Sequence, residues 1–415
     1  MVNKNTYSIL HCHTDLSSGT TNIDSVTKYK DYIKQAKEDG LYNITFTEHG
    51  NVFEWFHKKQ AVEAAGMKYI HAVEAYVTED LNEKVRDNYH CLLFAANYEG
   101  FKELNRLVSS SFNRAKVKCY GENEQFYYSP RILFDDLIST SENIIISTAC
   151  MAGILCKGNT SIKKKFLKFI IKNKKRCFLE VQHHNCDAQK EYNKYLAKIA
   201  NKYGLQLLAC TDTHSLNEQH KKGRSILQKS KNVFFDNEEE WDLTYKNYEQ
   251  LVAAFERQGA LTKEEYMSAI NNTNCLVDMV EDFKLDFDTK YPAIYENPLK
   301  TYKEKIDDAY KKHKYLKQRY TEEEYRNVID NELDVYEKTK SIDFMLLQTF
   351  MREWEKENGI ECGYGRGSVS GSEIAYTLGI TQMDSMKFGL NFFRFMNPDR
   401  VSNADIDTDY SSEDR

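Results

Sequence analysis

Short apolar runs alternate with helical patterns through the first two hundred residues of this 415-residue chain. Helical spacing of apolar residues fills most intervals, as in residues 24–39 and 189–203. The expected strands are residues 7–10, 44–47, 69–76, 91–95, 144–147, 178–181 and 206–209. Repeated strand–helix units predict a parallel α/β fold, most simply a barrel with its working side chains at the C-terminal ends of the strands.

Residues that bind metals recur at the ends of these expected strands. They are His11 and His13, His49, Glu74, Cys150, Asp212 and His214, with His90 at the start of its strand, where the rule does not expect it. A single histidine at a strand end is usually structural, but repetition at several ends favours one shared site. Imidazole, carboxylate and thiolate ligands together suit zinc, manganese or iron better than magnesium.

A row of acidic residues lies close to the C-terminus of the chain. Asp405, Asp407 and Asp409 alternate with Ile406 and Thr408, so in an extended segment all three carboxylates point to one side. Carboxylates packed this closely call for a cation, and paired carboxylates can hold the two magnesium ions of nucleotidyl transfer. A solvated acidic edge or a loose calcium loop is the alternative reading.

A glycine-serine loop, GYGRGSVSGS, precedes this row at residues 363–372. Closely spaced glycines let backbone N–H groups approach a phosphate, and the apolar pattern that follows predicts a helix after the loop. Such a run is also common in linkers. However, basic residues (Lys387, Arg394, Arg400) stand between the loop and the carboxylates, and this combination favours a nucleoside triphosphate site.

The segments GRGSVSGSEIAYTLGIT, KFGLNFFRFMNPDRVS and DIDTD resemble the family C bacterial replicative DNA polymerases, the DNA polymerase III alpha subunits. The resemblance implies that Asp407 and Asp409 bind the catalytic Mg²⁺ ions. It assigns the incoming triphosphate to Gly365, Arg366, Gly367, Ser368, Gly371, Ser372, Arg394 and Arg400. Ala404 stands where the family usually has proline.

The N-terminal segments resemble the polymerase and histidinol phosphatase (PHP) domain, which is found at the N-terminus of the same polymerases. HCHTDLS, TEHGN, VEAYV, YHCLLFA, STACMAG, LEVQHH and TDTHS match its segments in order. The resemblance implies Zn²⁺, Mn²⁺ or Fe at His11, His13, His49, Glu74, His90, Cys150, Asp212 and His214, and an exonuclease activity of 3′→5′ polarity in some members. Ser18 occupies the slot of a further family aspartate, which puts a third metal in question.

These patterns divide the chain into three parts. We expect a PHP-type, distorted TIM-like barrel over residues 1–225, a helical connection over 226–290, and the first part of a nucleotidyltransferase-like palm, similar to that of polymerase beta, over 291–415. Charged helices are expected at residues 302–320, 322–340 and 344–358. Met345, Leu346, Phe350, Met351 and Trp354 repeat at helical spacing, and we interpret them as core.

Composition restricts the setting of the protein. The net charge of −6 excludes a surface that is basic throughout, so DNA contacts would come from local patches. The lysine-rich residues 163–176 are most simply a solvated amphipathic helix. Ten scattered cysteines without a CxxC pair, no signal peptide and no apolar run of membrane-spanning length predict a reducing, cytoplasmic location.

The leading hypothesis is the N-terminal part of a DNA-directed DNA polymerase that acts in DNA replication. Once a C-terminal part completes it, it would transfer dNMP from a dNTP to a primer 3′-OH. Its expected partners are primer-template DNA, dNTP, that missing half, in the same chain or a second one, a sliding clamp and a proofreading exonuclease. Two alternatives are a stand-alone metal-dependent phosphoesterase or nuclease, and a non-catalytic, metal-stabilised scaffold.

Overall fold

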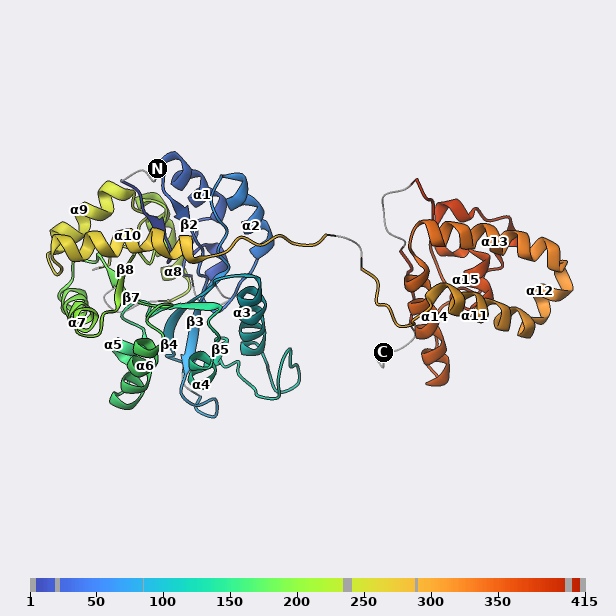
Figure 1. Ribbon diagram of the computed structural model, residues 1–415, viewed down its shortest axis with the longest axis horizontal. Helices are drawn as coiled ribbons and strands as arrows, with labels where there is room; N and C mark the ends of the chain where they lie inside the picture. The colour runs from blue at the N-terminus through green and yellow to red at the C-terminus, as the bar shows by residue number, and fades with distance from the viewer. Residues whose placement is uncertain are drawn as a thin grey trace. The chain divides into compact units, whose positions relative to one another are not determined.

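The computed structural model describes residues 5–18, 23–84, 86–233, 241–287, 290–399 and 405–410. By its internal contacts the chain divides into two compact units, Met1–Lys284 and Leu285–Arg415 (Figure 1). Each unit is described by itself. The three-part division expected from sequence stays a prediction.

The first unit is built around eight strands in two sheets. The strands are β1 (Ser8–Ile9), β2 (Asn43–Ile44), β3 (Ala72–Thr78), β4 (Tyr89–Ala95), β5 (Arg131–Leu133), β6 (Ile144–Ser147), β7 (Cys177–Gln182) and β8 (Gln206–Cys210). β1 and β2 pair in parallel, and the larger sheet has the order β5-β3-β4-β6-β7-β8. β4 runs antiparallel to both of its neighbours, whereas the other pairs are parallel.

Single parallel bridges join the two sheets at both sides. Beyond β2, His49 pairs with Glu74 of β3; beyond β1, Cys12 pairs with Thr213, which follows β8. The His13 N–H donates to the Thr213 carbonyl (2.8 Å), and the Thr213 N–H donates to the His11 carbonyl (3.1 Å). The strands therefore close into an irregular barrel, as expected from the strand–helix repetition.

Alternation along the strands separates two apolar layers. The inward-facing cluster combines strand residues with one helix; it contains Leu10, Ala72, Leu92, Phe94, Ile145, Phe178, Leu208, Leu276 and Val277. The strand residues between these, such as Val73, Leu93 and Leu179, belong to a second cluster that packs under the outer helices. Two residues beyond Ala72 and Phe178 on the inward face come Glu74 and Glu180, so the apolar interior leads into a polar layer.

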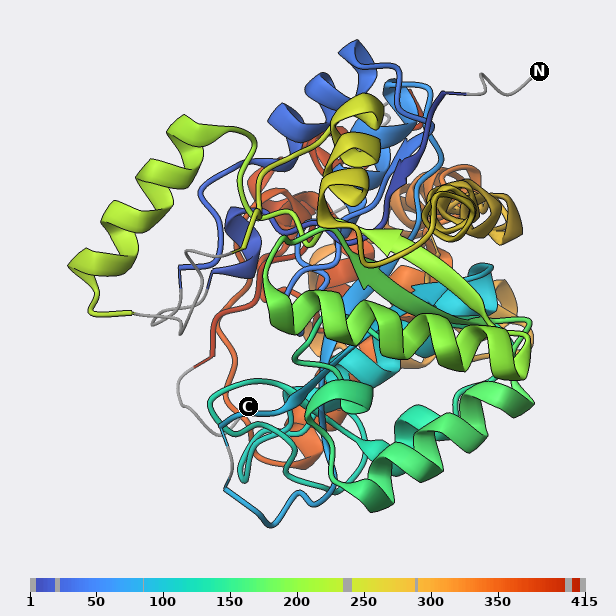
Figure 2. The same ribbon diagram turned by 90° about the vertical axis from the view of Figure 1, so that its left-hand side faces the viewer.

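Helices surround this barrel (Figures 1 and 2). They are α1 (Tyr29–Glu38), α2 (Trp55–Ala64), α3 (Tyr98–Ser111), α4 (Phe134–Ile138), α5 (Ile154–Lys157), α6 (Thr160–Lys172), α7 (Asp187–Tyr203), α8 (Glu218–Ser230), α9 (Tyr248–Gln258) and α10 (Lys263–Met279), with a 3₁₀ turn at Asp15–Ser17. Thr273 and Asn274 of α10 hydrogen-bond to Ser8 of β1. This helix therefore belongs to the barrel unit.

Apart from shifts of a few residues in the strand bounds, the strands differ from the sequence expectation in two respects. β5 was not predicted, because it has only three residues and pairs with the edge of β3. The antiparallel direction of β4 was not predicted either, and it accounts for His90. Because β4 runs opposite to β3 and β6, its first residues lie at the same end of the barrel as the last residues of these two neighbours.

The second unit is helical in its described part. Its helices are α11 (Pro298–Lys312), α12 (Lys314–Arg319), α13 (Glu322–Lys338), α14 (Ile342–Glu357), α15 (Glu373–Thr377) and α16 (Ser385–Phe388), with 3₁₀ turns at Ser368–Gly371 and Phe392–Arg394. The helix expected over residues 302–320 is broken at His313. Tyr302, Tyr325 and Tyr336 are fully buried in the core of this unit.

The apolar stripe of α14 is only partly core. Met345 and Leu346 are buried, but Phe350, Met351 and Trp354 are 48%, 37% and 50% exposed. With Ile360 and Tyr410 among other residues, these exposed side chains line a hollow of about 330 Å³. The expectation that the whole stripe is core was therefore wrong, because in the later turns the described elements of this unit cover another face of the helix, where Thr349 and Glu355 are buried.

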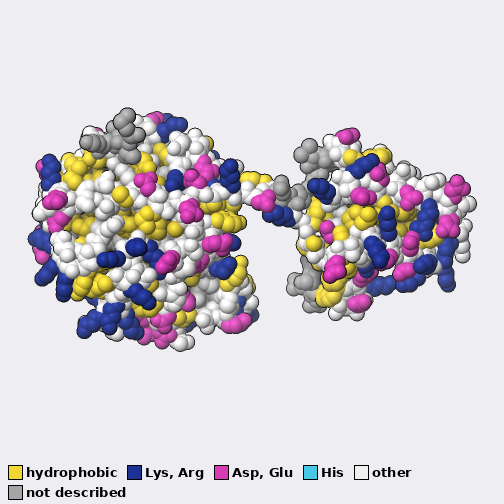
Figure 3. All heavy atoms as spheres, viewed as in Figure 1, with side chains coloured by type: hydrophobic (Ala, Val, Ile, Leu, Met, Phe, Trp, Pro, Cys, Tyr) yellow, Lys and Arg dark blue, Asp and Glu magenta, His cyan; other side chains and the backbone are white. Residues whose placement is uncertain are grey.

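Charged side chains of both signs are interspersed over the faces seen in Figure 3. The lysine-rich segment forms α6, whose Ile162, Phe166 and Ile170 are buried while Lys164 and Lys168 are exposed; its amphipathic interpretation is confirmed. Among the described residues, no helix combines the length and apolar character needed to cross a bilayer.

A buried carboxylate supports the helix that follows the glycine-serine loop. Glu332 of α13, 2% exposed, accepts hydrogen bonds from the Ser372 hydroxyl and from the backbone N–H groups of Glu373 and Ile374. Burial outweighs these hydrogen bonds and raises the pKa of Glu332 to about 7. The folded state therefore favours protonated Glu332. The stabilisation of the fold by this proton is complete below the unfolded pKa of 4.5 and is lost as pH rises through the folded pKa of about 7.

We expect Glu332→Gln to make the stability of the second unit less dependent on pH. In the wild type, amide hydrogens of α13 and α15 should exchange faster at pH 8 than at pH 5, after correction for intrinsic rates. The variant should show a smaller difference. Burial also raises the pKa of Glu373, so some dependence should remain. Glu323→Gln, an exposed position of the same helix, is the control; equal pH dependence in all three proteins would contradict the assignment.

Candidate metal centre and nucleotide-binding loop

Seven of the eight predicted barrel ligands meet at one end of the barrel. Their ligand atoms form three overlapping groups, each within 4.8 Å: His13 with His49 and His214; His11 with His13 and Asp212; and His49 with Glu74 and His90. Glu74 links them, because its two oxygens lie 3.3 Å from His11 Nε2, 3.2 Å from His13 Nε2, 3.0 Å from His49 Nδ1 and 2.9 Å from His90 Nδ1.

The barrel closure places two of the motifs opposite each other. In the bridge between Cys12 and Thr213, each paired residue is flanked by two ligands, His11 and His13 on one strand and Asp212 and His214 on the other. Alternation turns the flanking side chains to the same face. Asp212 Oδ1 accordingly lies 3.2 Å from His11 Nε2 and 3.4 Å from His13 Nε2.

Two non-glycine residues at this end have a left-handed backbone. Asp212 has φ +48°, and Ala149, which precedes Cys150, has φ +58°. Such conformations cost free energy for residues with a Cβ atom and persist where the surroundings hold them, commonly at functional sites. One outlier is itself a predicted ligand and the other directly precedes one, at the ends of two different strands.

The cluster has the chemistry of an ion-binding site. The buried His11 Nε2, His13 Nε2, His49 Nδ1, Glu74 Oε2 and Asp212 Oδ1 have no hydrogen-bond partner among the described residues, although they converge. Buried polar atoms are rarely left unpaired. Nitrogen and carboxylate-oxygen donors at this spacing fit divalent transition-metal ions.

Neighbouring histidines keep the two buried carboxyl groups of the cluster ionised. Burial opposes ionisation of Glu74, but His90, His11 and His49 hold the pKa of its carboxyl well below the usual range. Burial likewise opposes ionisation of Asp212, and His11 and His214 hold the pKa of its carboxyl well below its ordinary value. Both carboxyl groups are therefore anionic at neutral pH, as ligands of a cation must be.

Sequence reasoning missed the groups that orient the histidines. His11 Nδ1 lies 2.8 Å from the buried Glu180 Oε1. His13 Nδ1 lies 2.9 Å from the Ser17 hydroxyl, which donates to Glu48. Each contact holds the proton on Nδ1 and leaves Nε2 free as a ligand. A glutamate inside the apolar strand CFLEVQ was the available signal for Glu180.

Cys150 and Ser18 lie at the margin of the cluster. The Cys150 Sγ atom is 3.9 Å from His90 Nδ1, and burial, with the charges of Asp212 and Glu74, raises the pKa of its thiol well above the ordinary value. The Ser18 hydroxyl donates to the Ser25 carbonyl (3.0 Å) and accepts from the Asp24 N–H (3.1 Å). Ser18 therefore orders its loop through backbone contacts.

In the second unit the carboxylate row lies against the glycine-serine loop. Asp405, Asp407 and Asp409 are exposed, whereas Ile406, Thr408 and Tyr410 are half-buried on the opposite face. Antiparallel bridges pair Arg366 with Asp407 and Cys362 with Tyr410. Arg366 Nε lies 3.8 Å from Asp407 Oδ2 and 3.7 Å from Asp409 Oδ1, so one cation stands between the two predicted metal ligands.

Glycines make the close approach of the loop possible. Gly365 (φ +85°) and Gly367 (φ +80°) have left-handed backbones, and a Cβ at Gly365 would meet Thr381 at 2.9 Å. Gly367 is only 3.7 Å, measured from an ideal Cβ, from Asp407 Oδ2. The loop therefore approaches the carboxylate row with its backbone, as a phosphate-binding loop requires.

The other predicted triphosphate residues differ in accessibility. Ser368 and Arg394 are exposed, whereas Gly371 and Ser372 are buried. The Ser372 hydroxyl hydrogen-bonds to Glu332 and Tyr336 and caps α15, so it supports the loop from behind. Arg400 and Ala404 lie outside the described residues.

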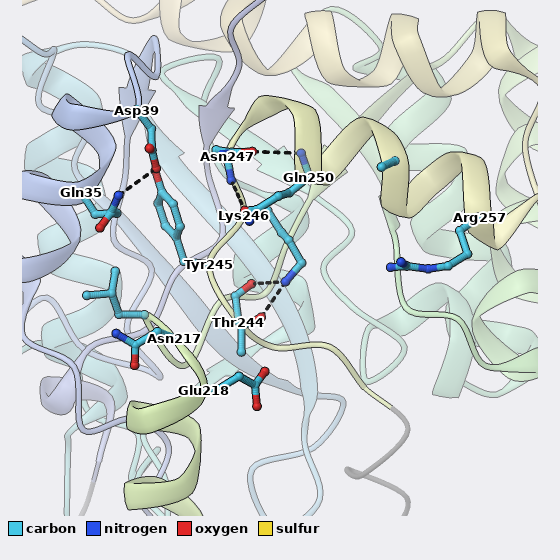
Figure 4. Close-up of a pocket in the computed structure, with 12 residues that line it drawn as sticks. Gln35, Asp39, Asn217, Glu218, Thr244, Tyr245, Lys246, Asn247, Gln250 and Arg257 are labelled. Carbon is cyan, nitrogen blue, oxygen red and sulfur yellow. Dashed lines mark hydrogen bonds between the residues drawn. The ribbon is translucent and has the colours of Figure 1, made fainter.

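A larger pocket, of about 580 Å³, lies elsewhere on the barrel unit (Figure 4). Its polar groups are largely paired with one another. Gln35 donates to Asp39 (3.1 Å), and Lys246 donates to the Thr244 hydroxyl and carbonyl. None of the predicted metal ligands lines this pocket, and it does not alter the assignment of the metal centre.

Comparison with known proteins agrees with both sites. Residues 10–184 match the PHP domain, and residues 300–415 match the bacterial DNA polymerase III alpha NTPase domain. DNA polymerase III subunit alpha of Aquifex aeolicus is 30% identical over 442 residues and that of Borreliella burgdorferi 30% over 433; each alignment covers 98% of this chain. Over these segments the chain is similar to the bacterial DNA polymerase III alpha subunits.

The Thermus aquaticus subunit is 26% identical and matches 100% of this chain. The chain spans about a third of the length of these curated relatives, 36%, 35% and 39% respectively. The α/β class, the PHP barrel and the resemblance to polymerase III alpha subunits are thus confirmed. The predicted role of each site residue stays a prediction.

We expect Glu180→Gln to weaken metal binding in the PHP barrel. Without the carboxylate partner, the His11 ring is held less firmly and its Nε2 is a weaker metal ligand. Loss of such a partner typically lowers metal affinity ten- to a hundredfold. Competition of the 415-residue chain with a chromogenic chelator for Zn²⁺ or Mn²⁺ measures this. Glu191→Gln, with a 74% exposed side chain, is the control. An unchanged affinity would show that Glu180 does not support the centre.

Proposed function

We propose that this chain supplies the PHP barrel and part of the nucleotidyl-transfer site of a replicative DNA polymerase. The observation that carries this is the carboxylate row paired directly with the glycine-serine loop, with Arg366 between Asp407 and Asp409. A further polypeptide segment, in the same chain or a second one, would complete the enzyme with a third carboxylate. The reaction is transfer of dNMP from a dNTP to a primer 3′-hydroxyl on a DNA template.

In this proposal each group has a separate task. Asp407 and Asp409 hold Mg²⁺ ions, which neutralise the charge that develops on the transferred phosphate. The backbone around Gly365 and Gly367 binds phosphate oxygens, and Arg366 moves from the carboxylates to the triphosphate once cations bind there. Arg394 and Arg400 add positive charge. A sliding clamp and a proofreading exonuclease would be further partners of the assembled enzyme.

We infer a separate activity for the PHP barrel, hydrolysis of phosphodiesters with 3′→5′ polarity on DNA. The grouping of unpaired buried ligand atoms within 4.8 Å of one another supports it. The ions are Zn²⁺, Mn²⁺ or Fe, which act as Lewis acids and activate water. Glu74 and Asp212 contribute the anionic ligands, while Glu180 and Ser17 orient two of the histidines.

A non-catalytic scaffold is the second candidate for the barrel, and Ser18 favours it. A serine at this position provides no carboxylate for a metal ion. The Ser18 hydroxyl instead hydrogen-bonds to backbone groups of its own loop. In this case metal ions would stabilise the fold and the barrel would bind a partner protein.

The two sites can be tested separately by their carboxylates. Asp212→Asn should abolish Mn²⁺-dependent hydrolysis of thymidine 5′-phosphate p-nitrophenyl ester by the 415-residue chain, whereas Asp407→Asn should leave it unchanged. Equal loss in both variants would contradict a hydrolytic site confined to the barrel. If the wild type binds metal and chelation lowers its melting temperature, but no hydrolysis occurs, the scaffold role holds instead.

Nucleotide binding tests the second unit. We expect Asp407→Asn to weaken Mg²⁺-dependent binding of dATP at least tenfold in isothermal titration, because a cation ligand is lost. Asp405→Asn removes a carboxylate from the same row and should have little effect. Similar losses in the two variants would indicate a diffuse acidic surface in place of a specific metal site.

A further inference from the structure

A buried imidazole beside the metal centre is not used by the predicted ligand set. His184 follows β7 and is 1% exposed, and its Nε2 atom has no hydrogen-bond partner among the described residues. Buried polar atoms are nearly always paired in folded proteins. The atom is therefore a candidate to bind a ligand.

Hydrogen bonding determines the tautomer of this ring. The backbone N–H of Asp242 donates to His184 Nδ1 at 3.2 Å. An amide N–H can only donate, so Nδ1 carries a lone pair and the proton of the neutral ring is on Nε2. Burial lowers the pKa of His184 to about 4, which keeps the ring neutral at physiological pH. Its Nε2–H is consequently a donor and cannot coordinate a cation.

The ring is held rigidly on several sides. Trp241 stacks on it, with the ring centroids 6.3 Å apart, and the His184 carbonyl accepts from Gln258 Nε2 at 2.6 Å. Asp242 is itself anchored by Lys246, whose Nζ lies 2.8 Å from Oδ1. Figure 4 shows the same lysine reaching back to Thr244. A donor fixed in this way is preorganised for a ligand.

The chain segment that holds the ring also contacts a predicted metal ligand. Leu243, next to Asp242, accepts a hydrogen bond through its carbonyl from the His214 N–H at 2.8 Å. The carboxylate of Asp212 and the imidazole of His11 are among the charges that act on the His184 ring. His184 follows the C-terminal end of β7, the strand that carries Glu180, so it lies at the same end of the barrel as the metal centre and outside the predicted ligand set.

We propose that His184 Nε2–H donates a hydrogen bond to a non-bridging phosphate oxygen of the phosphodiester held at the barrel metal centre. This rests on the proposed phosphodiesterase function of the barrel. A phosphate oxygen is an acceptor, as the tautomer requires. His184 is then a substrate-binding residue that positions the phosphate, while the neighbouring histidines and carboxylates bind the ions.

Inorganic phosphate is the probe for this role. The 415-residue chain loaded with Mn²⁺ is titrated with phosphate, and its metal content is measured separately. His184→Phe keeps the ring plane but removes the donor, and phosphate affinity should fall at least tenfold, as expected for a lost hydrogen bond to a charged group. His184→Gln restores an N–H donor and should recover part of the affinity. Metal content should be the same in all proteins.

His183→Phe is the matched control. His183 is the preceding residue, equally buried at 2% exposure, and both its ring nitrogens are unpaired among the described residues. Its Nε2 lies 4.0 Å from Asp242 Oδ2, and its ring packs against Phe255. Phosphate affinity should be unchanged in this variant.

Several outcomes would overturn the proposal. Loss of metal from His184→Phe would make His184 a ligand, and phosphate affinity equal to that of the wild type would exclude a donor role. Absence of phosphate binding to the wild-type metal-loaded chain would exclude it as well. If the wild type binds metal and phosphate in this pattern but cleaves no phosphodiester, the hydrolytic function fails while the donor role of His184 stands.

Discussion

The pairing of Cys12 with Thr213 is the contact on which the barrel and its metal centre depend. It joins the first strand of the unit to the last across about two hundred residues of sequence. Two ligand pairs flank this bridge, so the same backbone contact that closes the barrel brings His11 and His13 to Asp212. The loop-closure entropy of such a long-range contact must be offset by the buried layers on both faces of the strands.

The closed barrel surrounds groups that would be unstable without a counterion. Glu74 and Asp212 are buried anions among histidines, and several of their oxygen and nitrogen atoms have no hydrogen-bond partner among the described residues. His11 and His13, whose Nδ1 atoms contact Glu180 and Ser17, direct their Nε2 atoms toward Glu74 and Asp212. A divalent cation would satisfy these atoms together, which explains why so many polar side chains are tolerated above an apolar barrel interior.

The second unit also brings several carboxylates close together, but at its surface. Three exposed carboxylates share one face of an extended segment, and Arg366 from the glycine-serine loop lies between two of them. The loop can come this close because Gly365 and Gly367 have conformations that disfavour a Cβ atom. Behind the loop, Ser372 and Glu332 form a buried hydrogen-bonded support. The exposed surface thus holds the groups that are predicted to bind cations and phosphates, and the buried side keeps them in place.

The sequence by itself determined the strand–helix alternation, the ligand motifs of the barrel and the alternation of the carboxylate row, because these depend on side-chain period and local spacing. It also indicated Glu180 weakly, as a charge within an apolar strand. Only the tertiary structure decided the antiparallel direction of β4, which brings His90 to Glu74, and the exposure of Phe350 and Trp354 on α14. The tautomer of His184 also depends on a backbone amide distant in sequence. Strand direction, coverage of a helix face and such contacts are set by packing between distant segments, which local patterns do not encode.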